Sequence, residues 1–346
     1  MDTLSTCAAF ERAPKERALD DFDRILDHAW ETYEAGDAAQ ALKLYEDAIT
    51  QWPDRTDPWY EKGLVLKETG ETEKAMACFD HVLSLDPDDY RAMVKRADVL
   101  IWDFGEYEKG FELCKEAKKR GPDLATAAEI SHWSALALLY MGQLDEALRE
   151  IDSAIKKAVP TADDYSLKGE IQIRRGDPKA ALAPLSEAIV LEPTNGYFHY
   201  LYGYAFLYLG KEQTADKHFR RASELNPDQY RVPCRMPERE FDLTVRRAVG
   251  ALPAWVTKHL HNVEVSIEDL PPKQDLLDGL DFDVLGAYYG HGEPNRDETE
   301  LPERIILFQR NLETFCGNRD ELREEIEKTV IHEVAHRFNI DDDKIR

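Results

Sequence analysis

The stretch GDAAQALKLYEDAITQWPD, residues 36–54, is followed by GETEKAMACFDHVLSLDPD, residues 70–88. Glycine, alanine, an aromatic residue and proline take matching places in both, 34 residues apart. Glycine tolerates the positive φ that ends the first helix of a pair, and proline ends the second helix because it cannot continue it. A fixed period of this length indicates an array of stacked helix pairs, and this pattern decides the fold of the first part of the chain.

The same landmarks continue to Pro227, so the sequence predicts six helix pairs over residues 22–229. Small residues such as Ala41 and Ala181 recur where two helices must approach closely. Stacked pairs of this kind form an all-α superhelical solenoid, in which the first helices line a concave groove. The later pairs have their connecting glycines at Gly105, Gly142, Gly176 and Gly210.

These residues resemble the tetratricopeptide repeat (TPR), in six copies. The resemblance implies that a protein or peptide partner binds in the concave groove. A spacer with no binding role is the alternative.

Four tyrosines follow one another at helical spacing in the first helix of the sixth repeat: Tyr197, Tyr200, Tyr204 and Tyr208. The alignment of the repeats places them on the concave face, where large rigid rings would contact a partner or substrate. The alternative is that they pack against whatever caps the array.

Composition limits the partners. The chain has 69 acidic and 44 basic residues and a formal net charge of −25. Such a chain is repelled by nucleic-acid phosphates and by anionic lipid, so the sequence predicts no nucleic-acid partner and no membrane association. The five cysteines form no CxxC pair, and no run of about 18 apolar residues occurs. With no leader pattern in the first twenty residues, we expect a reduced, cytoplasmic protein of unknown oligomeric state.

The repeat period stops after Pro227, and we predict a linker at 230–237 followed by a second domain at 238–346, with an N-terminal extension at 1–21. Apolar residues recur at helical spacing from Phe241 to Leu252, and alternation at 263–267 indicates a strand. Residues 284–290 and 304–312 read as two more strands, and the polar stretch between them reads as a loop. The expected fold of this part is a small α+β domain.

The end of the chain carries the chemistry, in a helix predicted from Asp320 to Phe338. It contains His332-Glu333-Val334-Ala335-His336. Histidines at i and i+4 lie on one helix face, so both imidazoles can bind one zinc ion, and Glu333 is placed to act as general base. A surface helix with two incidental histidines is the alternative.

Residues 238–346 resemble the small bacterial zincin-like metallopeptidase family, through VLGAYYG (284–290), RIILFQRNLE (304–313) and TVIHEVAHRFNIDDDKI (329–345). The resemblance implies an HExxHxxGxxD site that holds Zn²⁺ through His332, His336 and Asp342. Asn339 stands in place of the glycine, and Asn tolerates positive φ better than other side chains do. Asp341 and Asp343 remain candidates for the third ligand.

The sequence therefore predicts a cytoplasmic zinc metallopeptidase whose TPR groove recruits a protein or peptide substrate. The alternative is a non-catalytic adaptor with a structural or inactive zincin-like domain, and a weaker one is a hydrolase of a non-peptide amide. RIILFQ (304–309) is the candidate edge strand for pairing with an extended substrate. Tyr288, Tyr289 and His291 are candidates for oxyanion support, with sheet aromatics and a loop histidine as the favoured alternative.

Overall fold

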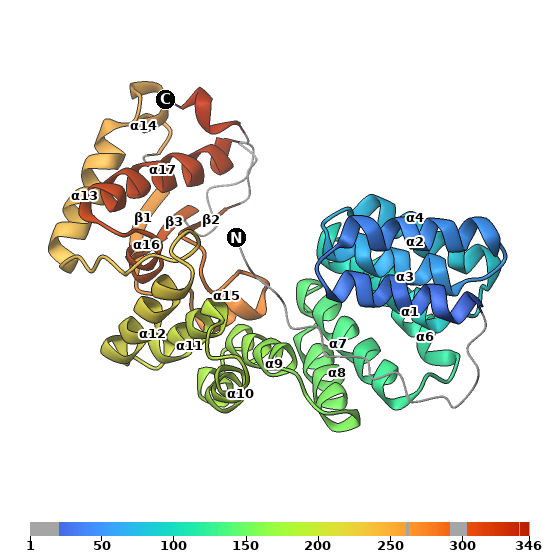
Figure 1. Ribbon diagram of the computed structural model, residues 1–346. Helices are drawn as coiled ribbons and strands as arrows, with labels where there is room; N and C mark the ends of the chain where they lie inside the picture. The colour runs from blue at the N-terminus through green and yellow to red at the C-terminus, as the bar shows by residue number, and fades with distance from the viewer. Residues whose placement is uncertain (1–20, 261–262, 291–302, 339, 346) are drawn as a thin grey trace. The chain divides into compact units, whose positions relative to one another are not determined.

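The computed structural model describes residues 21–260, 263–290, 303–338 and 340–345 (Figure 1). The chain divides into two compact units, Met1–Gly105 and Glu106–Arg346. The described residues contain 17 α-helices and one three-stranded sheet. The predicted fold class, an all-α TPR solenoid followed by a small α+β domain, is confirmed.

The first unit consists of helix pairs in the predicted register. Its elements are α1 (Asp21–Glu34), α2 (Ala38–Gln51), α3 (Asp57–Glu68), α4 (Thr72–Leu85), α5 (Tyr90–Asp98) and a π-helical turn, η1 (Val99–Asp103). Gly36 and Gly70 have φ of +92° and +81° and connect the helices of the first two pairs, as the repeat pattern predicts. Ala41 and Ala75 are fully buried, so these small side chains lie where the helices meet.

The second unit begins with the remaining repeats. Their helices are α6 (Tyr107–Lys119), α7 (Leu124–Tyr140), α8 (Leu144–Lys157), α9 (Ala162–Arg174), α10 (Pro178–Leu191), α11 (Gly196–Tyr208) and α12 (Glu212–Leu225). Several glycines of the first helices permit close packing: an added Cβ at Gly203 would lie 2.6 Å from the ring of Phe219. The chain then runs without regular structure over 230–237, where the linker is predicted.

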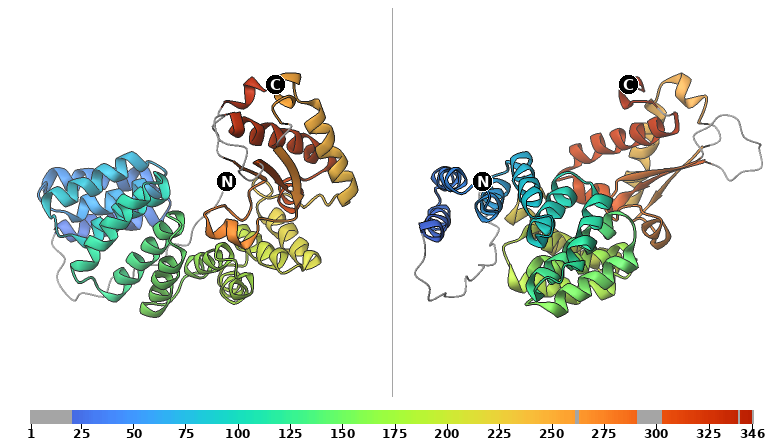
Figure 2. Two further views of the ribbon diagram at one scale, coloured as in Figure 1. Left: turned by 180° about the vertical axis from the view of Figure 1, so that it is seen from behind. Right: turned by 90° about the vertical axis from the view of Figure 1, so that its right-hand side faces the viewer.

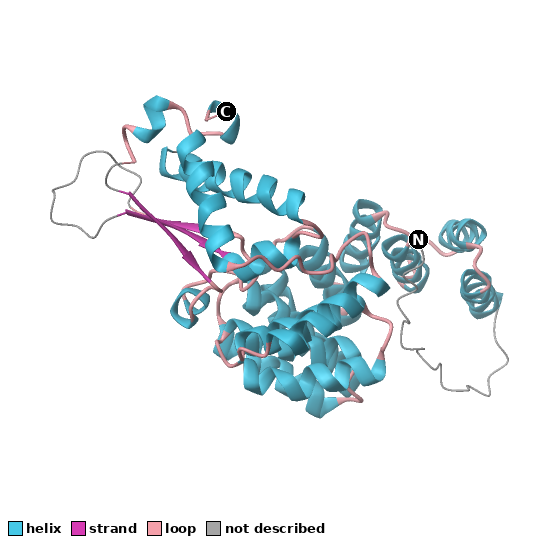
Figure 3. Ribbon diagram, turned by 90° about the vertical axis from the view of Figure 1, so that its left-hand side faces the viewer, coloured by secondary structure: helices cyan, strands magenta, loops and turns pink. Residues whose placement is uncertain are grey.

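The rest of the second unit mixes helices and strands (Figure 3). Its elements are α13 (Glu238–Ala251), α14 (Ala254–Thr257), β1 (Val263–Glu268), α15 (Lys273–Leu277), β2 (Gly286–Tyr289), β3 (Glu303–Phe308), α16 (Gln309–Phe315), α17 (Arg319–Phe338) and a 3₁₀ turn, η2 (Asp342–Lys344). In the views of Figure 2, α17 lies along one face of the sheet.

The sheet has the order β1-β3-β2, with β3 parallel to β1 and antiparallel to β2. Alternate β3 side chains face opposite ways: Ile305 and Leu307 belong to the core that contains α13 and α17, and Ile306 belongs to a smaller cluster on the other face. The predicted edge strand 304–309 is wrong, because β3 is the central strand of the described sheet and ends at Phe308. Gln309 already begins α16.

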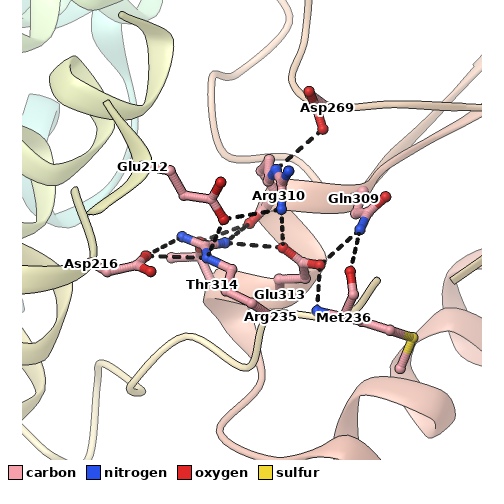
Figure 4. A network of polar contacts seen from close by, with 9 residues as sticks. All are labelled: Glu212, Asp216, Arg235, Met236, Asp269, Gln309, Arg310, Glu313 and Thr314. Carbon is pink, nitrogen blue, oxygen red and sulfur yellow. Dashed lines mark hydrogen bonds and ion pairs between the residues drawn. The ribbon is translucent and has the colours of Figure 1, made fainter. Parts of the chain in front are cut away.

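A buried ionic network joins the last repeat to the α+β part of the second unit (Figure 4). The Glu313 side chain of α16 is fully buried, and its carboxylate accepts hydrogen bonds from Arg235 at 3.2 Å and Arg310 at 3.0 Å. Arg235 also pairs with Asp216 of α12, and Arg310 pairs with Glu212 of the same helix at 3.2 Å. Repeat six is therefore fixed to the α+β part through the partly exposed carboxylates of α12, two arginines and the fully buried Glu313.

None of the described helices has both the length and the apolar character needed to cross a membrane.

Candidate functional site

The second half of α17 carries the two histidines that the sequence singles out. His332 and His336 lie one helical turn apart on an exposed face, and their Nε2 atoms are 3.0 Å apart. The planes of the two rings cross at 86°. Both imidazoles thus direct a nitrogen toward the same point, as the i, i+4 spacing predicts.

The predicted third ligand, Asp342, lies beside this pair. Its carboxylate oxygens are 3.2 and 3.3 Å from Nδ1 of His332, on the edge of the ring opposite Nε2. The chain reaches this position because α17 ends in a turn in which the Ile340 N–H donates to the Ala335 carbonyl at 3.2 Å. Such a bond across six residues is typical of a helix end that reverses the chain. Asn339, predicted to make this turn, lies outside the described residues.

Glu333 occupies a different environment from its histidine neighbours. Its side chain points to the sheet, and the residue is 6% exposed. Burial raises the pKa of its carboxyl to about 7, against the opposing effects of the His332 charge and a hydrogen bond from the Tyr288 backbone N–H. A carboxyl with a pKa near neutrality can both accept and return a proton at physiological pH.

Strand β2 is the wall of the site nearest to Glu333. A Cβ added to Gly286 would lie 2.8 Å from Thr329 Cγ2 and 3.1 Å from the Glu333 carboxylate, so glycine lets α17 lie directly on this strand. β2 is also an edge of the described sheet. The Phe308 N–H donates to the Leu285 carbonyl, and by the alternation of antiparallel pairs the backbone groups of Gly286 and Tyr288 point away from β3.

The edge of the described sheet beside Glu333 is therefore β2, and the expectation of an edge strand at 304–309 is wrong. β2 has the free edge beside Glu333, and the signal that could have found it is the glycine inside VLGAYYG. The hydroxyls considered for oxyanion support are already engaged: Tyr288 donates to Glu303 at 2.9 Å, and Tyr289 donates to Asp275. The alternative of sheet aromatics describes them better. His291 and the predicted polar loop lie outside the described residues.

The described side chains fit one part of a zinc site. Two imidazole nitrogens converge, and zinc takes such ligands. In the described part of the chain, however, no group of three or more His, Cys, Asp or Glu side chains is arranged to hold a metal ion. The reason is visible in the geometry, because Asp342 contacts Nδ1 of His332 and not the side on which the two Nε2 atoms meet. A carboxylate in this position orients the imidazole ring.

Three of the four tyrosines of α11 are covered by the C-terminal part of the same unit. Tyr204 is 1% exposed and packs edge-on against Phe282, with ring centroids 4.9 Å apart. The hydroxyl of Tyr200 donates to Asp283 at 2.9 Å, and that of Tyr208 donates to the Phe282 carbonyl at 3.1 Å. These rings do not line an open groove in this structure. Their surroundings match the alternative considered from the sequence, packing against the segment that caps the array.

Tyr197 lies at the other end of this row. It is 36% exposed, and its hydroxyl donates to Glu170 of α9 at 2.7 Å. α9 is covered as well, since Arg174 pairs with Asp281 and α15 contacts the helix. The first helices of repeats five and six thus face the α+β part of the chain.

Comparison with known protein families gives matches to two kinds of family. Residues 32–97, 134–196 and 197–229 match tetratricopeptide-repeat families, and residues 260–346 match the zincin-like metallopeptidase family. The chain is therefore a tetratricopeptide-repeat array joined to a zincin-like metallopeptidase domain.

Individual relatives match the chain weakly. DnaJ homolog subfamily C member 3 of Rattus norvegicus is 24% identical over 222 residues, which cover 61% of this chain and 44% of the relative. Protein FlbA of Caulobacter vibrioides is 25% identical over 38% of this chain and 22% of its own length. The chain thus spans less than half of these relatives.

Solved structures show the repeat fold. The type IV pilus biogenesis factor PilW has a TM-score of 0.55 at 16% identity, with 61% of this chain and 96% of that chain covered. Pseudomonas aeruginosa pilF has a TM-score of 0.52 at 14% identity, with 60% and 92% covered. At these identities the likeness concerns the fold alone.

Proposed function

We propose that the chain is a zinc-dependent metallopeptidase that hydrolyses a protein or peptide substrate brought to it by its repeats. The observation that carries the proposal is the convergence of His332 and His336 next to a buried Glu333 with a pKa near 7. Glutamate at this position is not needed to hold a metal, whereas a peptidase needs a base beside the attacking water. The arrangement therefore favours an enzyme over a structural metal site.

Zinc would be held by the Nε2 atoms of His332 and His336, with Asp342 proposed from the sequence as third ligand. When bound there, zinc supplies a Lewis acid for the scissile carbonyl and lowers the pKa of water. Glu333 takes the proton from the attacking water and passes it to the leaving amine. Burial raises the pKa of this carboxyl to about 7, close to the value that suits a group which both accepts and returns a proton.

We propose that the substrate binds along the edge of β2. An extended peptide that pairs with the outward backbone groups of Gly286 and with the Tyr288 carbonyl would lie along α17 and pass directly over Glu333, which accepts a hydrogen bond from the Tyr288 N–H. Such pairing reads backbone and not side chains, so it accepts many sequences.

Selection of the substrate is then left to the repeats. TPR arrays bind protein partners, and the first helices of repeats five and six are already covered by the α+β part. We therefore place recruitment on repeats one to four. The net charge of −25 favours a basic partner segment.

Metal content and hydrolysis test this proposal together. We expect purified protein to hold about one zinc ion per chain and to cleave an unfolded substrate such as reduced casein. His332→Ala and His336→Ala should each lose the metal and the activity. His28→Ala, at an exposed position in α1, is the matched control and should retain both.

The variants at Asp341, Asp342 and Asp343 identify the third ligand. Alanine at the ligand should strip zinc, whereas alanine at a carboxylate that only orients His332 should weaken zinc binding by about 10- to 100-fold. Full zinc content with no hydrolysis of casein or of any protein captured by the repeats would support the non-catalytic adaptor instead.

A further inference from the structure

The second unit contains a cavity of about 590 Å³ between repeat six and the first half of α17. Its lining includes aromatic side chains, among them Tyr200 and Tyr230, whose ring centroids lie 4.9 Å apart, and the exposed Phe315. Five carboxylates also line it: Glu321, Glu324 and Glu325 of α17, Asp228, and Asp283, which accepts a hydrogen bond from the Tyr200 hydroxyl.

The charges of this cavity do not balance. Five carboxylates face two cationic side chains, Arg231 and Lys328, and Lys328 is already paired with Glu325 at 3.1 Å. Glu324 and Asp283 form no ion pair with any described lysine or arginine. Burial raises the pKa of the Asp283 carboxyl, against the opposing effects of the hydrogen bond from Tyr200 and the charge of Arg174, so its charged form is poorly solvated. A cationic ligand would offset this cost.

A buried acceptor points to the same kind of ligand. Asn311 lines the cavity and is 1% exposed. Its amide group donates to the carbonyls of Phe282 and Val284, at 3.0 and 2.6 Å, while its Oδ1 has no hydrogen-bond donor among the described residues. Lysine and arginine offer only donors, so they complement such an acceptor, and their aliphatic stems and charges suit tyrosine faces.

The cavity lies next to the start of the strand proposed to bind substrate. Leu285, which lines the cavity, directly precedes β2, and Lys328 precedes the Thr329 that packs on Gly286. Glu324 and Glu325 lie eight or nine residues before Glu333, or about 12–14 Å along the helix axis. An extended peptide covers that distance in about four residues.

We propose that this cavity binds the lysine or arginine side chain of a peptide substrate, about four residues from the bond that is cleaved. That the ligand belongs to a peptide substrate rests on the proposed peptidase function. That the ligand is a cation rests on the lining of the cavity alone. It supplies the sequence selectivity that backbone pairing with β2 lacks.

Peptide binding to the Glu333→Gln chain tests the cation site separately from catalysis, because this variant lacks the general base. Two fluorescein-labelled decapeptides of alanine and serine, identical except for one central lysine or norleucine, are titrated against it by anisotropy. We expect the lysine peptide to bind about tenfold more tightly, as a cation over aromatic rings and beside partly buried carboxylates should. Adding Glu324→Gln and Glu325→Gln should reduce this ratio to less than about threefold.

Two further variants test whether the preference for lysine depends on the charges that line the cavity. Glu327→Gln removes a charge from the same helix at a residue that does not line the cavity, and should leave the ratio unchanged. Lys328→Gln removes a competing cation and should raise it. Equal binding of the two peptides, or a ratio that Glu324→Gln and Glu325→Gln leave unchanged, would overturn the proposal.

One further result would distinguish a small amine from a peptide side chain as the ligand, and another would distinguish the cation site from the proposed peptidase function. If free spermidine binds with this dependence on Glu324 and Glu325 while the lysine peptide shows no preference, the cavity takes a small amine and the substrate assignment fails. A lysine preference in binding, combined with no hydrolysis by the zinc-loaded wild type, would refute the peptidase and leave the cation site standing.

Discussion

Replacement of Glu313 by glutamine tests the network that fixes repeat six to the α+β part (Figure 4). The substitution keeps the shape of the side chain and removes one negative charge between Arg235 and Arg310. Glu313 is 0% exposed and accepts four hydrogen bonds, two from these arginines and two from Gln309 and the Met236 N–H, each of the latter at 2.8 Å. Glutamine can accept through one oxygen only, and its amide group would face a guanidinium.

The expected loss of stability follows from these contacts. Breaking a buried ion pair costs about 3–5 kcal/mol when the remaining charge is left alone. Here both arginines keep a second carboxylate, Asp216 for Arg235 and Glu212 for Arg310, so the lower end of that range, about 3 kcal/mol, applies. For a unit of this size, each kcal/mol lowers Tm by about 2–4 °C, so the second unit should melt roughly 6–12 °C earlier.

Scanning calorimetry of the full chain measures this shift. Glu224→Gln is the control, because it breaks an exposed pair with Arg221 and should change Tm by little. If Glu313→Gln melts within about 2 °C of that control, the network does not hold repeat six to the α+β part and the reasoning fails.

Three further predictions concern single positions. Gly286→Ala should reduce hydrolysis by tenfold or more at unchanged zinc content, because the new methyl group displaces the Glu333 carboxylate or Thr329; an unchanged kcat would show that β2 does not position the base. Tyr204→Ala should destabilise the second unit by about 3–5 kcal/mol in urea unfolding, whereas a stable variant that loses its partner would restore the groove assigned to the tyrosines. Burial raises the pKa of Cys78 to about 11, so only about a thousandth of this thiol is ionised at pH 8; iodoacetamide should label it only on unfolding, and rapid labelling in the native chain would contradict the buried position.

The sequence predicted the repeats well because their physics is local. Each connecting glycine and each buried alanine lies within one helix pair, so the 34-residue period reports the fold directly. The paired histidines were equally readable, since i and i+4 share a face on any helix. The domain boundaries at 21, 229 and 237 stay a prediction.

Contacts between distant segments could not be read in the same way. No local pattern tells which strand lies at an edge, and β3 is central only because β1 and β2 pair with its two sides. The tyrosines of α11 carry the pattern of a binding surface, but residues 280–285 return to cover them from far along the chain. Asp342 is a further case, because its carboxylate lies on the Nδ1 edge of His332, a distinction that spacing does not contain.

Hydrolysis by the Glu333→Gln chain is the most direct test of the central claim. Wild-type and variant protein, each shown by metal analysis to hold equal zinc, are incubated with reduced casein, and new peptide termini are counted by mass spectrometry. We predict cleavage by the wild type and a rate lower by about 10² or more in the variant, the size expected for loss of a general base. Equal rates in the two proteins would place the chemistry away from the His332–Glu333–His336 site and contradict the account.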